Sequence, residues 1–366
     1  MRVLLLSDVN SIHTRRWAAS LKEAGVDPGI FSLAEPKETW CEDYGIPLFL
    51  SRWQPKRSFF SKAFSKIFYP LQICSLKKAI QTYHPDIIHA HYASSYGLLG
   101  ALSGFHPFIL SVWGSDIFEF PKISFFHRMV LRYNLANADK ILSTSQAMAR
   151  ETNKYINKNI EITPFGVDLT HFIPQKVDSL FNEKDIVIGT VKALEPIYGI
   201  RCLMKAFQIV KGNNRELPLK LLIVGSGSEE MDLKKLAKDL AIQNDVVFTG
   251  RVGFSDVPRY HNMISIYVAL STFESFGVSI VEAQATETPV VVSNVGGLPE
   301  VVEDGVTGFV IEPKNPVAAA KAIESLVHDK ALRERMGKNG RQRVIANYNW
   351  NDSLAQMIAI YREVMR

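Results

Sequence analysis

The stretch from Ile264 to Gly308 constrains the fold of this chain more than any other part. Its first seven residues, ISIYVAL, form an apolar run of strand length that ends at a Ser-Thr pair suited to capping a helix. Helical spacing follows at Val278, Val281 and Ala285, and a second apolar run begins at Pro289. This order predicts one parallel crossover unit, and hence an α/β sheet that binds ligands at the carboxyl ends of its strands.

Two acids stand out in this unit. Glu274 and Glu282 are eight residues apart, so helical geometry brings both near one face of a helix. Gly277 lets backbone N–H groups approach an anion closely, which the dipole of a helix start also favours. The layout predicts a phosphate site beside two carboxylates that accept hydroxyl hydrogen bonds, as a nucleotide sugar requires. The alternative is that Glu274 only complements the helix dipole and that Glu282 is solvated.

These residues resemble the donor-site signature of the retaining glycosyltransferases of family 4. The run ESFG from Glu274, the acid Glu282 after seven intervening residues, and the following PVV and GG all agree with it. The resemblance implies that Glu274 contacts the donor sugar and that Glu282 holds the ribose hydroxyls. It also implies donor-binding positions at Phe276, Gly277 and Val278.

The resemblance extends over nearly the whole chain and implies an α/β fold of the GT-B architecture. Two Rossmann-like parallel-sheet domains would face each other across a cleft, with the acceptor bound by the first domain and the donor by the second. We expect the domains at residues 1–174 and 175–345, with a final helix at 346–366 crossing back to the first. The resemblance implies no metal and no cofactor besides the nucleotide diphosphate sugar, which is a co-substrate.

The first half carries candidates for acceptor binding and catalysis. His13 and Arg16 lie just after the first predicted strand, where a parallel sheet binds ligands. The run HAHYASSYG resembles the family's acceptor-side motif, which implies that His91 lies by the reacting sugar. His89 and His91 would share one strand face as a possible metal pair, but without a third ligand we expect no metal. Asp116 matches a further acceptor-side segment, and a buried structural aspartate is the alternative.

The second half departs from the family at one important place. Relatives carry an Arg and, five residues later, a Lys that neutralise the departing diphosphate, whereas this chain has Ala193 and Tyr198. We predict that the neighbouring Lys192 supplies the charge, although on a regular strand its side chain would point the opposite way. Other segments match, and by resemblance they assign donor binding to Gly225, Arg251 and the backbone of Val252.

Composition limits the cellular setting. The net charge is +5, and the first 175 residues hold all of the excess, with 19 Lys and Arg against 14 Asp and Glu. Such a basic half suits an anionic lipid, a nucleic acid or a phosphorylated acceptor, and among these we expect no nucleic acid. Three cysteines without a C-x-x-C pair, no signal peptide and no apolar run of membrane-spanning length predict a cytoplasmic protein.

The segment of residues 52–69 has the most unusual composition in the chain, with five cations, six aromatic residues and no acid. Phe60, Phe64 and Phe68 recur at helical spacing, with Lys62 and Lys66 between them. This pattern is typical of an interfacial helix, so we expect peripheral contact with the anionic inner face of a membrane. The alternative is that the three phenylalanines are core.

Together these observations predict a retaining, metal-independent glycosyltransferase that moves a sugar from a nucleotide diphosphate sugar to a glycan or a lipid-linked acceptor. Polysaccharide assembly is the expected setting. Two alternatives remain. One is a sugar-nucleotide epimerase of the same architecture. The other is a catalytically inactive homologue acting as a partner subunit, which Ala193 and Tyr198 favour.

Overall fold

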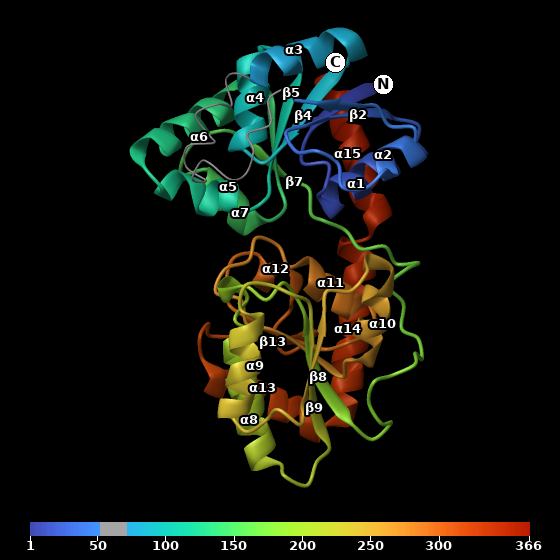
Figure 1. Cartoon of the computed structure of the whole chain (residues 1–366), viewed down its shortest axis with the longest axis vertical. Coiled ribbons are helices and arrows are strands. Elements are labelled where there is room, and N and C mark those ends of the chain that lie inside the picture. The colour runs from blue at the N-terminus through green and yellow to red at the C-terminus, as the bar shows by residue number, and fades with distance from the viewer. Residues whose placement is uncertain (52–71) are drawn as a thin grey trace. The chain divides into compact units, whose positions relative to one another are not determined.

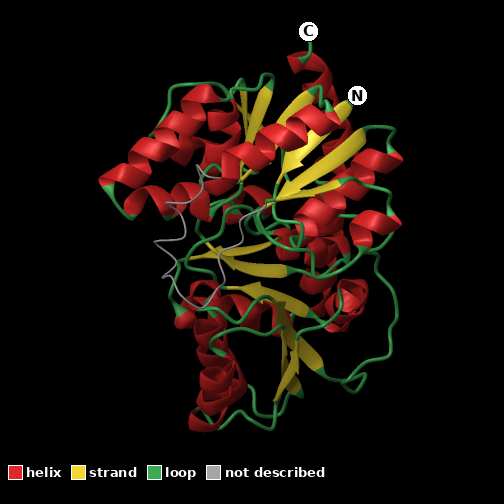
Figure 2. Ribbon diagram, turned by 45° about the horizontal axis from the view of Figure 1, so that its top comes forward, coloured by secondary structure: helices red, strands yellow, loops and turns green. Residues whose placement is uncertain are grey.

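Two separate parallel sheets organise the chain in the computed structural model, which describes residues 1–51 and 72–366. Unit 1 consists of Met1–Pro164 and Ser353–Arg366, and unit 2 consists of Phe165–Asp352. In each unit, helices pack on both faces of the sheet (Figure 2). The predicted α/β fold of two Rossmann-like domains is therefore confirmed. The predicted membrane-binding segment at residues 52–69 lies outside the described residues.

Unit 1 contains a seven-stranded sheet of order β3-β2-β1-β4-β5-β6-β7 in which every pairing is parallel (Figure 1). Its strands are β1 (Arg2–Leu6), β2 (Asp27–Ser32), β3 (Leu48–Leu50), β4 (Ile87–His91), β5 (Phe108–Val112), β6 (Lys140–Ser143) and β7 (Ile160–Ile162). Its helices are α1 (Ile12–Glu23), α2 (Trp40–Asp43), α3 (Ile73–Tyr83), α4 (Ser95–Ser103), α5 (Ser115–Phe118), α6 (Phe125–Asn137) and α7 (Gln146–Thr152), with a 3₁₀ turn η2 (Phe120–Lys122).

Unit 2 contains a six-stranded sheet of order β10-β9-β8-β11-β12-β13, again wholly parallel. Its strands are β8 (Ile186–Val191), β9 (Leu219–Val224), β10 (Val246–Gly250), β11 (Ile266–Ala269), β12 (Val290–Ser293) and β13 (Gly308–Ile311). Its helices are α8 (Ile200–Asn213), α9 (Glu230–Asp239), α10 (Val257–Met263), α11 (Val278–Ala285), α12 (Leu298–Val301), α13 (Pro316–His328) and α14 (Lys330–Asn347), with 3₁₀ turns η3 (Pro196–Tyr198) and η4 (Phe254–Asp256).

Apolar strands account for both sheets. Each central strand is buried on both faces, as in the run VLLL of β1, because helices cover a parallel sheet on both sides. In unit 2, the buried side chains of α8, α9 and α13 share one core with the strands, which Met336 of α14 joins, and α10 and α11 lie on the opposite face (Figure 1). Among the helices of the described residues, none is both long and apolar enough to cross a bilayer.

The boundary between the units differs from the predicted one at residue 174. The chain passes to unit 2 after Pro164, because Val167 pairs with the segment just before the last helix. The N–H of Val167 donates to the carbonyl of Tyr348 at 2.8 Å, and the N–H of Trp350 donates to Val167 at 3.0 Å. The last helix, α15 (Trp350–Val364), then contributes to unit 1 from Ser353 onward.

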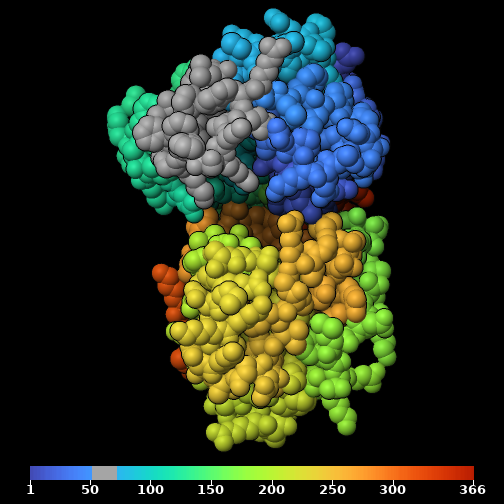
Figure 3. All heavy atoms as spheres, viewed as in Figure 1, coloured from blue at the N-terminus to red at the C-terminus, as the bar shows by residue number. Residues whose placement is uncertain are grey.

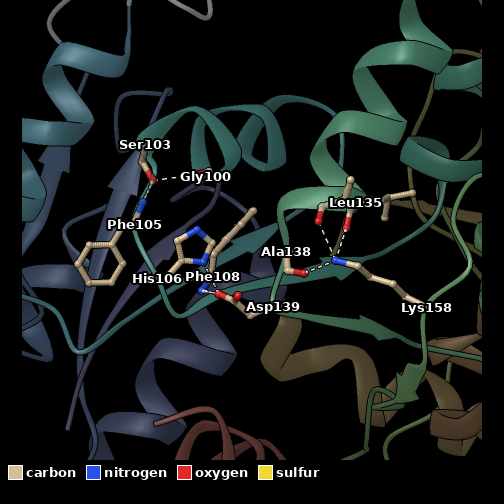
Figure 4. A network of polar contacts seen from close by, with 10 residues as sticks. Gly100, Ser103, Phe105, His106, Phe108, Leu135, Ala138, Asp139 and Lys158 are labelled. Carbon is tan, nitrogen blue, oxygen red and sulfur yellow. Dashed lines mark hydrogen bonds and ion pairs between the residues drawn. The ribbon is translucent and has the colours of Figure 1, made fainter.

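The amino-terminal edge of the first sheet holds a polar network that fixes α6 (Figure 4). The carboxylate of Asp139 accepts a hydrogen bond from the N–H of Phe108 and contacts the ring of His106 at 2.7 Å. The ammonium of Lys158 donates to the carbonyls of Ala136 and Ala138, both at 2.7 Å. These are carbonyls that the helix end leaves without partners, so Lys158 caps α6.

Candidate active site

The candidate donor site lies where the strand order of the second sheet reverses. β8 and β11 are neighbours in the sheet, and the chain leaves them in opposite directions along it. Ligands bind open α/β sheets at such a point, outside the carboxyl ends of the strands. Lys192 follows β8 directly, and Glu274 lies in the loop after β11.

Lys192 and Glu274 form an ion pair at this point. The ammonium nitrogen lies 2.5 Å from Oε2 of Glu274, and the two side chains are only 11% and 13% exposed. Burial lowers the pKa of Lys192, but the Glu274 carboxylate more than offsets this, so the pKa lies above its ordinary value. The ammonium also lies 4.8 Å from the ring centroid of Tyr198. A charged Lys192 therefore packs on the residue that replaces the family's lysine.

On a regular strand, the side chain of Lys192 would point away from the donor site, whereas in the structure it points toward Glu274. The reason is that Lys192 lies just beyond the end of β8. β8 stops at Val191, so the pleat no longer decides where the next side chain points. The N–H of Lys192 still donates to the carbonyl of Val224 at 3.0 Å, which fixes its backbone beside β9.

Glycines allow the surrounding loops to pack backbone against backbone. A Cβ at Gly225 (φ +136°) would overlap the carbonyl oxygen of Lys192, and one at Gly296 (φ +52°) would overlap that of Glu274. The N–H of Gly297 donates to the same Glu274 carbonyl at 3.1 Å. The two charged residues are thus held by neighbouring loops that only glycine permits.

Glu282 occupies a different environment from Glu274. α11 begins at Val278 with Gly277 (φ +105°) as its N-cap, so Glu274 lies in the preceding loop, and the two acids do not share a helix face as predicted. Glu282 is buried in the second helical turn, which rules out the solvated alternative. Its Oε2 lies 3.5 Å from Nε2 of His261 on α10, a fully buried residue.

Two of the predicted donor-binding positions lie at or just before the start of α11. The ring of Phe276 is buried edge-on against Phe165 and Tyr348, with centroids 6.3 and 5.5 Å apart, so its side chain belongs to the core. Val278 is half-buried at the first position of α11. The N–H groups of a helix start lack carbonyl partners within the helix and can donate to an anion.

The turn after β10 lies beside the Gly225 loop. The N–H of Gly225 donates to the carbonyl of Gly250 at 3.0 Å, and Arg251 and Val252 follow directly. Arg251 is exposed and Val252 is half-buried. The structure therefore brings the predicted nucleobase turn close to the loop that packs on Lys192.

In unit 1, the corresponding reversal of strand order lies between β1 and β4, and His91 ends β4 there. Its ring stacks on Trp113, with centroids 4.2 Å apart, and the ring of His13 meets the same indole edge-on at 5.8 Å. Nδ1 of His91 lies 3.0 Å from the hydroxyl of Ser7, which is 2.6 Å from that of Thr14. These contacts fix the orientation of the imidazole.

The other two acceptor-side candidates are Asp116 and Arg16. Asp116 is buried and accepts hydrogen bonds from the N–H groups of Ala93 at 2.7 Å and Gly114 at 2.8 Å, which agrees with its structural alternative. Burial raises the pKa of Asp116, and these hydrogen bonds offset part of the effect. Arg16 is half-buried on α1, three residues after His13 and therefore near the same helix face.

Both ring nitrogens of His89 lie at hydrogen-bond distance from hydroxyl groups of the protein. Its Nδ1 lies 2.7 Å from the hydroxyl of Tyr361 on α15, and its Nε2 lies 2.8 Å from the hydroxyl of Ser111. The residue joins the final helix to the sheet of unit 1. The two histidines of β4 thus make separate hydrogen bonds.

The burial of His89 gives the stability of unit 1 a predictable pH dependence. Burial lowers its pKa to about 3, whereas an unfolded histidine takes up a proton near pH 6.5. This contribution is complete above pH 6.5 and declines below it, because the unfolded state then binds the extra proton. We expect it to fall by roughly 1.5 kcal/mol between pH 6.5 and 5.

Urea unfolding at both pH values, for wild type and His89→Gln, measures this effect. The variant should lose less stability on acidification than wild type, whatever its stability at neutral pH. An equal loss in both proteins would contradict the assignment.

Two family models match the chain. Residues 2–145 match Glycosyl transferase 4-like, and residues 172–343 match Glycosyl transferases group 1. Among relatives, the chain is 28% identical to an uncharacterized glycosyltransferase of Methanocaldococcus jannaschii, over 79% of this chain and 78% of the relative. It is 26% identical to the N-acetyl-alpha-D-glucosaminyl L-malate synthase of Bacillus anthracis, over 88% of each chain.

Solved structures share the fold over the whole length. The sucrose-phosphate synthase of Thermosynechococcus elongatus superposes with a TM-score of 0.86 at 22% identity, covering 99% of this chain and 98% of that one. HepE of Anabaena, in complex with UDP, gives a TM-score of 0.82 at 19% identity and covers 99% of this chain and 100% of that one.

Proposed function

Because the chain belongs to the glycosyltransferases of the Glycosyl transferases group 1 and Glycosyl transferase 4-like families, we propose that it transfers a sugar from a nucleoside diphosphate sugar to a glycan or lipid-linked acceptor. The reaction retains the anomeric configuration and needs no metal. One observation carries the proposal: the buried pair of Lys192 and Glu274 lies at the reversal of the second sheet, in the loops before α8 and α11.

The donor diphosphate binds at the start of α11. Helix N–H groups and the helix dipole favour an anion there, and Lys192 adds a full positive charge. Glu274 accepts hydrogen bonds from the sugar hydroxyls, and Glu282, whose Oε2 lies 3.5 Å from Nε2 of His261, accepts them from the ribose. A cation and a helix start together supply the charge that a metal would otherwise bring, which supports metal-independent transfer.

Transfer with retention follows from a substitution on one face of the sugar. The bond from the anomeric carbon to the diphosphate oxygen breaks while the acceptor hydroxyl forms its bond on the same face. The hydroxyl proton passes to the departing phosphate oxygen. Lys192 stabilises the charge that grows on that oxygen, and this makes it the residue with the largest expected effect on turnover. Unit 1 binds the acceptor near His91, with His13 and Arg16 on the adjoining helix.

A catalytically inactive partner subunit is the second candidate. Ala193 and Tyr198 stand where relatives carry cations, and Glu274 already neutralises Lys192 in the free protein. Such a protein still binds nucleotide but does not turn it over. Donor turnover therefore separates the two candidates.

A thermal-shift screen tests whether unit 2 binds a nucleoside diphosphate. A ligand at about 100 times its Kd stabilises a protein by roughly 2.7 kcal/mol, which raises the Tm by several degrees. We expect UDP, GDP or ADP to give such a shift, with UDP tested first because HepE was solved with UDP. The shift should fall to about half or less in Glu282→Ala, because its Kd rises at least about tenfold, and should persist in Glu216→Ala, an exposed glutamate before β9. No shift with any nucleotide would contradict the proposal.

A further inference from the structure

Helix α6 has an apolar face that the described residues of its unit, 1–51, 72–164 and 353–366, leave exposed. Phe125, Met129 and Tyr133 follow each other at intervals of four residues and therefore lie along one face. They are 73%, 53% and 44% exposed, and the neighbouring Ile123 and Phe126 are 58% and 69% exposed. Of the sixteen large apolar side chains exposed in the described part of the chain, these five lie within eleven residues, so they form one patch rather than scattered exceptions.

The inner face of α6 is already fully used. Leu131, Asn134 and Leu135 are buried, and the amide of Asn134 donates to the carbonyl of Ala93 at 2.7 Å. Ser124 caps the first turn by accepting from the N–H of His127, and Lys158 caps the last (Figure 4). Because α6 is fixed at both ends, its outer face cannot rotate toward the core. The helix lies at the left edge of the molecule in Figure 3.

The charge beside this face has one sign. Lys122, Arg128 and Arg132 are exposed, and no acid lies between Pro121 and Ala138. Helix α4, which packs on α6, has no charged residue. The flanking acids are Glu119, in the preceding turn, and Asp139, which is engaged with Phe108 and His106. Cations on one flank of an apolar stripe are typical of helices that lie in a membrane interface.

We propose that the outer face of α6 docks on an anionic lipid bilayer. The helix lies parallel to the surface, with Phe125, Phe126 and Met129 among the upper acyl chains and the arginines at the headgroups. Each cation near such a surface strengthens binding about fivefold, and the effect fades within a Debye length. The inference concerns unit 1 alone and does not depend on the donor chemistry of unit 2.

Charge argues against a second copy of this chain as the occupant. A second copy packed symmetrically on this face would place Arg128 and Arg132 against like charges. An anionic lipid surface complements the patch in both respects, because it offers negative headgroups and an apolar layer beneath them.

Co-sedimentation with vesicles of 70% phosphatidylcholine and 30% phosphatidylglycerol tests the proposal. Wild type should bind these vesicles at low salt and much less to pure phosphatidylcholine. The stripe variant Phe125→Ser/Phe126→Ser/Met129→Gln should bind at least tenfold more weakly. Arg128→Gln/Arg132→Gln should bind about 25-fold more weakly, from two cations at fivefold each. Met231→Ser/Val317→Ser, which removes exposed apolar side chains from unit 2, is the matched control and should bind as wild type does.

Three results would overturn the proposal. One is wild type that never sediments with the anionic vesicles, and another is a stripe variant that binds as wild type does. The third is a wild-type dimer that the stripe variant converts to a monomer without lipid, which would assign the face to a second copy. A parallel variant, Lys56→Gln/Arg57→Gln/Lys62→Gln/Lys66→Gln, reports on the separate prediction for residues 52–69. An unchanged Tm and unchanged nucleoside diphosphate binding show that the stripe variant is folded and keep this test separate from that of the proposed function.

Discussion

Replacing Lys192 by alanine should lower kcat by about a hundredfold or more, because one preorganised charge contact in a transition state is worth that much. Among the described residues, no other cation forms an ion pair with Glu274, which lies 2.5 Å from this ammonium. Arg201, the next basic residue along the chain, pairs with Glu229 at 2.5 Å and Asp232 at 3.2 Å. Its charge is thus already committed to α9.

The Lys192→Ala experiment needs a stability control, because the substitution leaves Glu274 buried without its partner. Breaking a buried ion pair from one side commonly costs about 3–5 kcal/mol. The double variant Lys192→Ala/Glu274→Gln removes both charges and should regain part of that stability without regaining turnover. Lys220→Ala is the matched control, since Lys220 pairs with Asp245, which Lys211 also contacts. Unchanged kcat in Lys192→Ala would contradict its role.

Replacing Glu282 by alanine should weaken binding of the nucleoside diphosphate by roughly 1.5–3 kcal/mol, the range for a hydrogen bond to a charged group. This corresponds to about 10- to 150-fold in Kd. Glu274→Ala should instead lower kcat more than it weakens nucleotide binding, because that carboxylate contacts the sugar. Calorimetric titration of the nucleotide and steady-state rates measure the two effects separately. Equal nucleotide affinity in wild type and Glu282→Ala would remove Glu282 from the site.

Local patterns predicted the crossover unit of the second sheet that begins at Ile264. The apolar run ISIYVAL contains β11, and the helical spacing at Val278, Val281 and Ala285 coincides with α11. One pattern persists through each of these segments, so both could be identified from the sequence. The sequence also predicted which residues follow the carboxyl ends of strands, such as Lys192 after β8 and Glu274 after β11, because parallel sheets gather those loops at one edge.

Side-chain partners from distant segments could not be predicted in the same way. Lys192 and Glu274 are 82 residues apart in the sequence. The direction of the Lys192 side chain does not follow strand alternation, because β8 ends one residue earlier, at Val191. His261 reaches Glu282 only because α10 and α11 pack together, and helical spacing within either one carries no information about the other. The sequence also could not show which face of α6 is buried, because the helix FFHRMVLRYNLAN carries apolar residues on both sides.

Phosphorus NMR of nucleoside diphosphate sugars, incubated with the protein and a membrane extract containing glycan and lipid-linked acceptors, tests the central claim most directly. We predict that wild type converts one donor to its nucleoside diphosphate, that the sugar appears on an acceptor with its anomeric configuration retained, and that Lys192→Ala slows both changes by about a hundredfold or more. A protein that binds the nucleotide while every donor stays intact would contradict the proposed transfer and favour the inactive partner subunit.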